Sequence, residues 1–150
     1  MRALMLALAL VGAAGCDSRD TGAAPDAFPS PSSWLVVQVD GVPAPSGGDA
    51  VIGTVSFEGG EVSGIGGCNR YDASYSARSG DGAGRSIDVT GFTATEAACL
   101  PAVRPFEERM FDALRTASSW RTEADGRLVL LGPSTELELS PIYEAYDGAR

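Results

Sequence analysis

The sequence predicts a mainly β domain of the α+β class, an antiparallel sheet of about eight strands packed on one helix. Apolar and polar residues alternate in short stretches from Trp34 onward, which is typical of strands with one buried face. Glycine-rich turns separate many of these stretches, and the stretch after Pro101 has helical spacing instead. Several strands and one helix favour a sheet with the helix covering one face.

The strand pattern recurs along most of the chain after residue 33, without an internal repeat. Gly59 and Gly60 separate two of the predicted strands, and because glycine adopts positive φ at little steric cost, they predict a tight hairpin. The Gly-rich residues 79–84 predict a second turn. The predicted strands are residues 34–39, 51–57, 61–65, 71–78, 86–89, 120–122, 127–131 and 136–139.

The helix is predicted to begin near Pro105, which suits a first turn because proline lacks an N–H that would have no partner there. Apolar residues then recur at three- and four-residue intervals. Glu107 lies on the margin of this stripe, where a carboxylate needs a partner. The stripe consists of Phe106, Met110, Ala113, Leu114 and Ala117.

The N-terminal segment is typical of a lipoprotein signal peptide. It has one positive charge at Arg2, an apolar run over residues 3–11 and small residues before Cys16. The run is shorter than the roughly 20 residues of a membrane-spanning helix. Residues 1–15 are therefore predicted to be the signal peptide, and Cys16 the lipidated residue that carries palmitate or a similar acyl chain. Ala13, where leucine is commoner, leaves secretion as a soluble protein as the alternative.

These features divide the chain into four regions. After the signal peptide, residues 16–33 contain the lipidated cysteine and a Pro-, Ser-, Ala- and Asp-rich stretch with too little apolar surface to fold, which predicts a disordered tether. Residues 34–140 form the predicted domain, and residues 141–150 a C-terminal tail. The expected location is the cell envelope, with the domain facing the periplasm or the outside of a membrane.

The composition excludes several classes of function. The formal net charge is −9, and no lysine is present, so nucleic acid is an unsuitable partner. The chain also lacks histidine, which removes Ser-His and Cys-His nucleophile pairs and imidazole metal ligands. We therefore predict a protein that is not an enzyme and that needs neither a cofactor nor a metal.

Three motifs follow one another in a recognisable order. They are Gly64-Ile65-Gly66-Gly67-Cys68-Asn69-Arg70-Tyr71 with Tyr75 beyond it, Thr95-Glu96-Ala97-Ala98-Cys99, and the helix with Glu107, Phe111 and Leu114. Together with Trp34 they resemble the META domain family of HslJ-like bacterial envelope proteins over roughly residues 34–140. Ala97 stands where the family usually has methionine, and Ala73 where it tends to have glycine.

The resemblance implies an antiparallel half-barrel packed on one helix. It also implies a role in the cell envelope, linked to stress response or antibiotic tolerance, with no established enzymatic reaction. We interpret the protein as a non-catalytic interaction or structural module whose partners are the membrane, through Cys16, and an unknown envelope protein. The family's fold is similar to that of lipid-binding secretion pilot lipoproteins. The alternative is therefore a module that binds a lipid or another apolar small molecule inside the half-barrel.

Cys68 and Cys99 are an even pair of cysteines in a chain predicted to be exported. Export favours a disulfide between them. Two buried reduced thiols are the second interpretation, and a reactive Cys68 is the third, disfavoured because no histidine is present to lower its pKa.

The other candidate residues lie around the first motif. Asn69, after Gly67, suits a left-handed or hydrogen-bonded turn, and a ligand contact is the second interpretation. Arg70 suits an anion, a partner or a surface ion pair. We hypothesise that Glu107 accepts hydrogen bonds from the loop of residues 67–69 or pairs with Arg70; the alternative is that it points into water. The sequence also offers two roles, an apolar-ligand wall or ordinary core, for four aromatic residues: Trp34, Tyr71, Tyr75 and Trp120.

Overall fold

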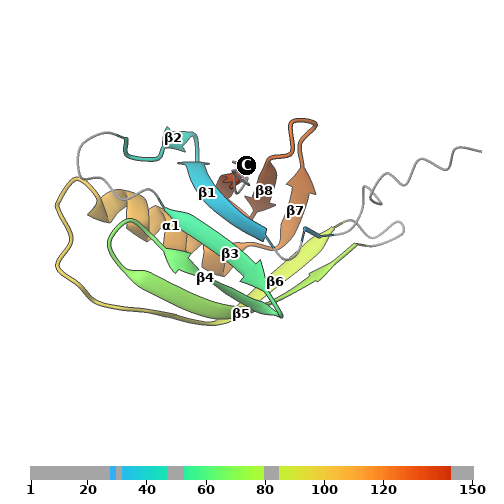
Figure 1. The fold of residues 1–150 in the computed structure, drawn as a ribbon, viewed down its shortest axis with the longest axis horizontal. Coiled ribbons are helices and arrows are strands. Elements are labelled where there is room, and N and C mark those ends of the chain that lie inside the picture. The colour runs from blue at the N-terminus through green and yellow to red at the C-terminus, as the bar shows by residue number, and fades with distance from the viewer. Residues whose placement is uncertain (1–27, 30–31, 47–52, 80–84, 143–150) are drawn as a thin grey trace, which may run out of the picture.

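The computed structural model describes residues 28–29, 32–46, 53–79 and 85–142 (Figure 1). The predicted signal peptide, Cys16 and most of the predicted tether lie outside the described residues, as do residues 51–52 of one predicted strand, residues 80–84 of the predicted second turn and residues 143–150 of the predicted tail. Among the described residues, no helix has the length and apolar character that a bilayer crossing requires.

The described strands form one antiparallel sheet that closes on itself. Neighbours in the sheet follow the chain order from β3 to β9, and β1 pairs with both β3 and β9. The elements are β1 (Ser32–Val39), β2 (Val42–Pro43), β3 (Thr54–Glu58), β4 (Glu61–Ile65), β5 (Arg70–Arg78), β6 (Ser86–Ala94), α1 (Arg104–Thr116), β7 (Ser119–Thr122), β8 (Leu128–Leu131) and β9 (Glu136–Pro141).

The barrel is closed, so the prediction of a half-barrel is wrong on this point. Strand β1 pairs with β3 through Ser32–Leu35, and with β9 from Trp34, opposite Pro141, to Val39, opposite Leu137. One long strand therefore connects the two ends of the sheet. The short strand β2 pairs only with β1 and was not predicted, because two residues are too few to show alternation.

The predicted hairpin and most predicted strands are confirmed, with one marked difference in length. Gly59 and Gly60 have φ of 58° and 87°, and Glu58 pairs with Glu61, as in a two-residue hairpin with both central φ values positive. Strand β6 continues to Ala94, beyond the predicted end at residue 89. Gly91, with φ of 64°, lies where the β5–β6 register shifts, and this bulge breaks the alternation on which the prediction relied.

Of the neighbouring strands in the barrel, β6 and β7 share the fewest paired residues. These strands share one residue pair, Ser86 with Ser119, and α1 lies between them in the chain. The helix packs against β6, β1, β8 and β9, so it covers the place where β6 and β7 diverge. In Figure 1 it lies across the barrel, behind β1 and β3.

Side chains fill the interior of the barrel. The predicted helix stripe is confirmed, because Phe106, Met110, Ala113 and Leu114 are buried, and Pro105 lies in the first turn. Their partners come from most of the strands. The largest fully buried side chains are Phe57, Met110, Leu114, Leu128, Leu130, Leu137 and Leu139.

The folded domain begins before residue 34, inside the segment predicted as a tether. The Phe28 ring lies 5.0 Å, centroid to centroid, from the rings of Phe57 and Trp120 and 5.5 Å from that of Tyr75. A single aromatic residue in a Pro- and Ser-rich stretch gives no periodic pattern, which is why the sequence did not indicate this contact.

Phe28→Ala is expected to lower the free energy of unfolding by about 1–2 kcal/mol, because it removes three aromatic contacts of a partly buried ring. Urea denaturation would measure the change. Leu100→Ala is the matched control, since that side chain is 65% exposed and its loss should change stability by less than about 0.5 kcal/mol. Equal effects of the two substitutions would contradict a docked Phe28.

Candidate functional site

A buried carboxylate joins the helix to the first motif. Glu107, in the first turn of α1, is only 5% exposed. Its Oε2 atom accepts hydrogen bonds from the backbone N–H groups of Cys68, at 2.9 Å, and Asn69, at 2.6 Å, and its Oε1 atom accepts one from Asn69 Nδ2 at 2.6 Å. These three donors offset the cost of burying a charge.

Asn69 extends this network to the segment before the helix. While its Nδ2 group donates to Glu107, its Oδ1 atom accepts from the backbone N–H of Ala97, at 2.7 Å, and from the Thr95 hydroxyl, at 3.0 Å. Because Nδ2 donates on one side and Oδ1 accepts two hydrogen bonds on the other, the orientation of the Asn69 side-chain amide is fixed. The loop between β4 and β5, the segment between β6 and α1, and α1 itself are thereby held together.

A disulfide between Cys68 and Cys99 closes the same junction. The two Cα atoms are 5.7 Å apart and the cysteines are 31 positions apart in the sequence. Asn69 Nδ2 lies 3.3 Å from Cys99 Sγ, and that sulfur lies 3.6 Å from Glu107 Oε1, a van der Waals contact because a disulfide sulfur carries no proton. We call the network of Asn69, Glu107, Thr95, the Ala97 amide and this disulfide the clamp.

Two glycines of the first motif allow the clamp to form. A Cβ atom on Gly66 would lie 2.5 Å from Phe111 Cε1 and 2.7 Å from Glu107 Cγ, so only glycine lets the loop approach the helix this closely. Gly67 has φ of 126°, a backbone conformation that residues with a side chain rarely adopt. These positions explain in physical terms why the motif needs consecutive glycines.

The structure decides between the placements considered for Glu107 and Arg70. Glu107 accepts hydrogen bonds from the residue 67–69 loop, as hypothesised, and the alternative in which it points into water is wrong. The predicted pairing with Arg70 is not found: Arg70 is exposed, and its backbone N–H and C=O bond to Thr95.

The aromatic candidates belong to the core in two separate groups. Tyr71 stacks on Phe92 and contacts Phe111, and its hydroxyl donates to the backbone oxygen of Thr54 at 2.8 Å. Burial raises the pKa of Tyr71 well above its ordinary value. Tyr75 instead contacts Phe57 and Phe28. Trp34 and Trp120 are buried core residues, so the four residues do not form a single ligand wall.

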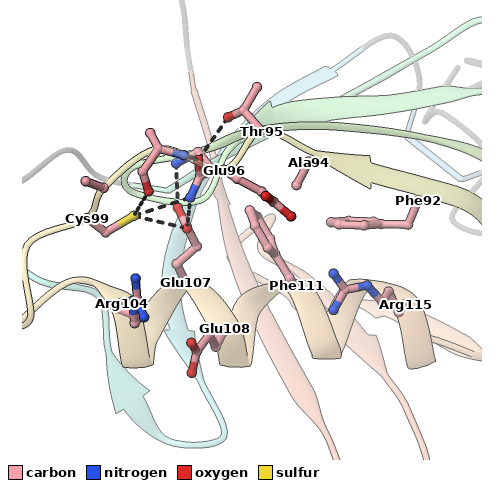
Figure 2. A pocket seen from close by; sticks show the side chains of 13 residues that line it. Phe92, Ala94, Thr95, Glu96, Cys99, Arg104, Glu107, Glu108, Phe111 and Arg115 are labelled. Atoms are coloured by element: carbon pink, nitrogen blue, oxygen red, sulfur yellow. Dashed lines mark hydrogen bonds between the residues drawn. The ribbon is translucent and has the colours of Figure 1, made fainter.

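A groove of about 730 Å³ lies on the surface beside the clamp. It runs between α1 and the second half of β6, and in Figure 2 Phe92 and Ala94 point from the strand toward Phe111 and Arg115 on the helix. Charged side chains at its borders are Glu96, Arg104, Glu108 and Arg115. Sequence reasoning did not identify this groove, because its strand half lies beyond the bulge at Gly91.

One group of potential metal ligands occurs in the described part of the chain: Cys68, Cys99 and Glu107, with ligand atoms within 4.8 Å of one another. Both sulfurs are bonded to each other, so neither is a thiolate donor. The carboxylate is already engaged by three N–H groups. The contacts of this cluster are those of a structural junction.

A family model for the META domain matches residues 29–141. The chain belongs to the META domain family. The fold is also similar to two structures solved by NMR. A protein from Burkholderia xenovorans is 22% identical, with a TM-score of 0.57 over 74% of this chain and 81% of the other. A second protein is 20% identical, with a TM-score of 0.55 over 73% and 88%. Comparison with curated proteins finds no significant match.

In this META domain the motif residues meet in one place. The departure at Ala97 leaves the clamp intact, because Asn69 uses the backbone N–H of that residue and not its side chain. The departure at Ala73 places a small side chain in the core at 4% exposure. Clamp residues also line one end of the groove.

Proposed function

We propose that this META-domain protein is exported, is anchored to the cell envelope through lipidated Cys16, and acts without catalysis by binding another envelope polypeptide. The observation that supports binding at the surface is the groove between α1 and β6, which lies beside a filled barrel interior. The polar groups of the clamp are engaged with one another, which favours a structural role over a chemical one. A role in envelope stress or antibiotic tolerance is part of the proposal.

A native mass spectrum of the protein, purified from an exporting host without denaturation, tests binding at the surface against binding inside the barrel. The expected result is a chain without a non-covalently bound lipid, because side chains occupy the interior. A lipid-like species that dissociates from the folded chain would overturn the proposal and favour the apolar-ligand alternative.

Detergent-phase partitioning tests the anchor. The protein is expected to enter the detergent phase, and Cys16→Ser is expected to move it to the aqueous phase, because acyl chains supply the affinity for the apolar phase. Glu108→Gln, on the exposed face of α1, should leave partitioning unchanged. Partitioning that does not depend on Cys16 would contradict lipid anchoring.

A further inference from the structure

The second half of β6 has a free edge toward the helix. On its other edge β6 pairs with β5 from Ser86 to Ala94, whereas toward β7 it shares only the pair of Ser86 with Ser119. Within the described residues no other strand pairs with this edge. An exposed strand edge presents unpaired N–H and C=O groups and is a template for another strand.

Two hydrogen bonds identify which amides face the free edge. Ile87 donates its N–H to Ser118, on the β7 side, and Thr95 donates its N–H to Arg70, on the β5 side. Because backbone groups alternate between the two edges of an extended strand, the amides of Val89 and Ala94 point away from β5. These positions lie on either side of the bulge at Gly91.

The groove supplies side-chain contacts next to this edge. Its volume of about 730 Å³ is within the usual range for ligand sites, about 300–1,000 Å³. Phe92 and Phe111, with ring centroids 5.2 Å apart, form an apolar floor. The backbone edge and the apolar floor together match an extended polypeptide, which offers main-chain N–H and C=O groups along its length, whereas the acyl chain of a lipid has none.

Arg115 indicates the charge of the occupant. Its guanidinium carbon lies 4.3 Å from the centroid of the Phe92 ring and 5.9 Å from that of Phe111, so cation–π contacts hold the charge at the end of the groove. No carboxylate forms an ion pair with Arg115 among the residues that the structure describes. An acidic side chain on the occupant would supply that partner.

We propose that a segment of a partner protein binds in extended conformation along the free edge of β6, adding a strand in the groove between β6 and α1. An apolar side chain of this segment packs on Phe92 and Phe111, and an acidic side chain pairs with Arg115. The inference rests on the proposed function, because it names the chemistry of the envelope polypeptide. Strand addition of this kind combines main-chain hydrogen bonds with pockets for alternate side chains.

The test begins with a displayed library of random peptides, each about 12 residues long, which at about 3.4 Å per residue exceeds the length of β6. Selected peptides are expected to alternate apolar residues with polar ones and to carry an acidic residue. NMR spectra of the ¹⁵N-labelled protein should show the largest changes at Val89, Ala94 and Arg115. Changes confined to another face would overturn the inference.

N-methylated versions of one selected peptide separate strand addition from simple groove filling. Methylating the amides that face β6 should weaken binding at least about tenfold, whereas methylating the alternate set should leave affinity within about twofold. Equal effects of the two sets would overturn strand addition. Arg115→Glu should weaken an acidic peptide at least about tenfold, and the control Arg109→Glu, on the exposed face of α1, should not.

The outcomes also separate the inference from the proposed function. If the selected peptides bind on another face, or tolerate both methylation patterns, strand addition at β6 is wrong. The proposal that the protein binds a polypeptide then still stands. If the library yields no binding peptide and the native mass spectrum shows a bound lipid, both the strand addition and the proposed polypeptide binding are wrong.

Discussion

Glu107→Gln is expected to lower the free energy of unfolding by about 2–3 kcal/mol. The carboxylate accepts three hydrogen bonds, two of them at 2.6 Å, and hydrogen bonds to charged groups contribute about 1.5–3 kcal/mol each. Gln keeps one acceptor oxygen and turns an NH₂ group toward N–H donors, so at least one buried donor loses its partner. Urea denaturation followed by circular dichroism would measure the change.

Glu108→Gln is the matched control for this prediction. It makes the same chemical change at the next residue of α1, whose side chain is exposed, and should change stability by less than about 0.5 kcal/mol. Similar stability of the two variants would contradict a clamp built on Glu107. Asn69→Ala is expected to lower the stability by a similar amount to Glu107→Gln, because it removes the side-chain amide that connects Glu107 to the backbone N–H of Ala97.

The double substitution Cys68→Ala and Cys99→Ala is expected to lower the free energy of unfolding by about 3–4 kcal/mol. The disulfide joins residues 31 positions apart, and on the chain-entropy model closing a loop of that length restricts the unfolded chain by about this amount. Denaturation with and without a reducing agent would measure it.

The reducing agent provides the control for the cysteine pair. It should lower the stability of the unchanged protein toward that of the double variant and leave the double variant unaffected. The intact mass of the exported protein should be two hydrogens lower than that of the reduced chain. Two titratable thiols in protein purified from an exporting host would contradict the disulfide.

The candidate site could be predicted from the sequence where local chemistry determines it. Glu107 was identified because helical spacing placed a carboxylate beside an apolar stripe, and burial then required donors. Asn69 was identified as a turn residue, a possible ligand contact and part of the loop that bonds Glu107. Its contact with the Ala97 N–H was not predicted, because Ala97 lies beyond two further strands. Phe92 and Arg115 were missed, since no sequence pattern relates residues on a strand and a helix across a groove.

The sequence was sufficient to predict the strands and the helix, but not that the sheet closes into a barrel. Alternation and the glycine pair located β4 and its hairpin with β3 directly. Closure depends on β1 being long enough to pair with β3 and β9 at once, and strand length is poorly determined by alternation. Phe28 was missed for the related reason that an isolated contact has no period.

Photocrosslinking in the envelope tests the central claim, that the groove between α1 and β6 binds a polypeptide. A photoreactive amino acid at Ala94, in the groove, would be compared with one at Glu58, in the β3–β4 hairpin. The account predicts one discrete polypeptide adduct from position 94, absent from position 58, with the crosslink mapped by mass spectrometry to an extended segment containing an acidic residue. A lipid adduct, or equal labelling from the two positions, would contradict it.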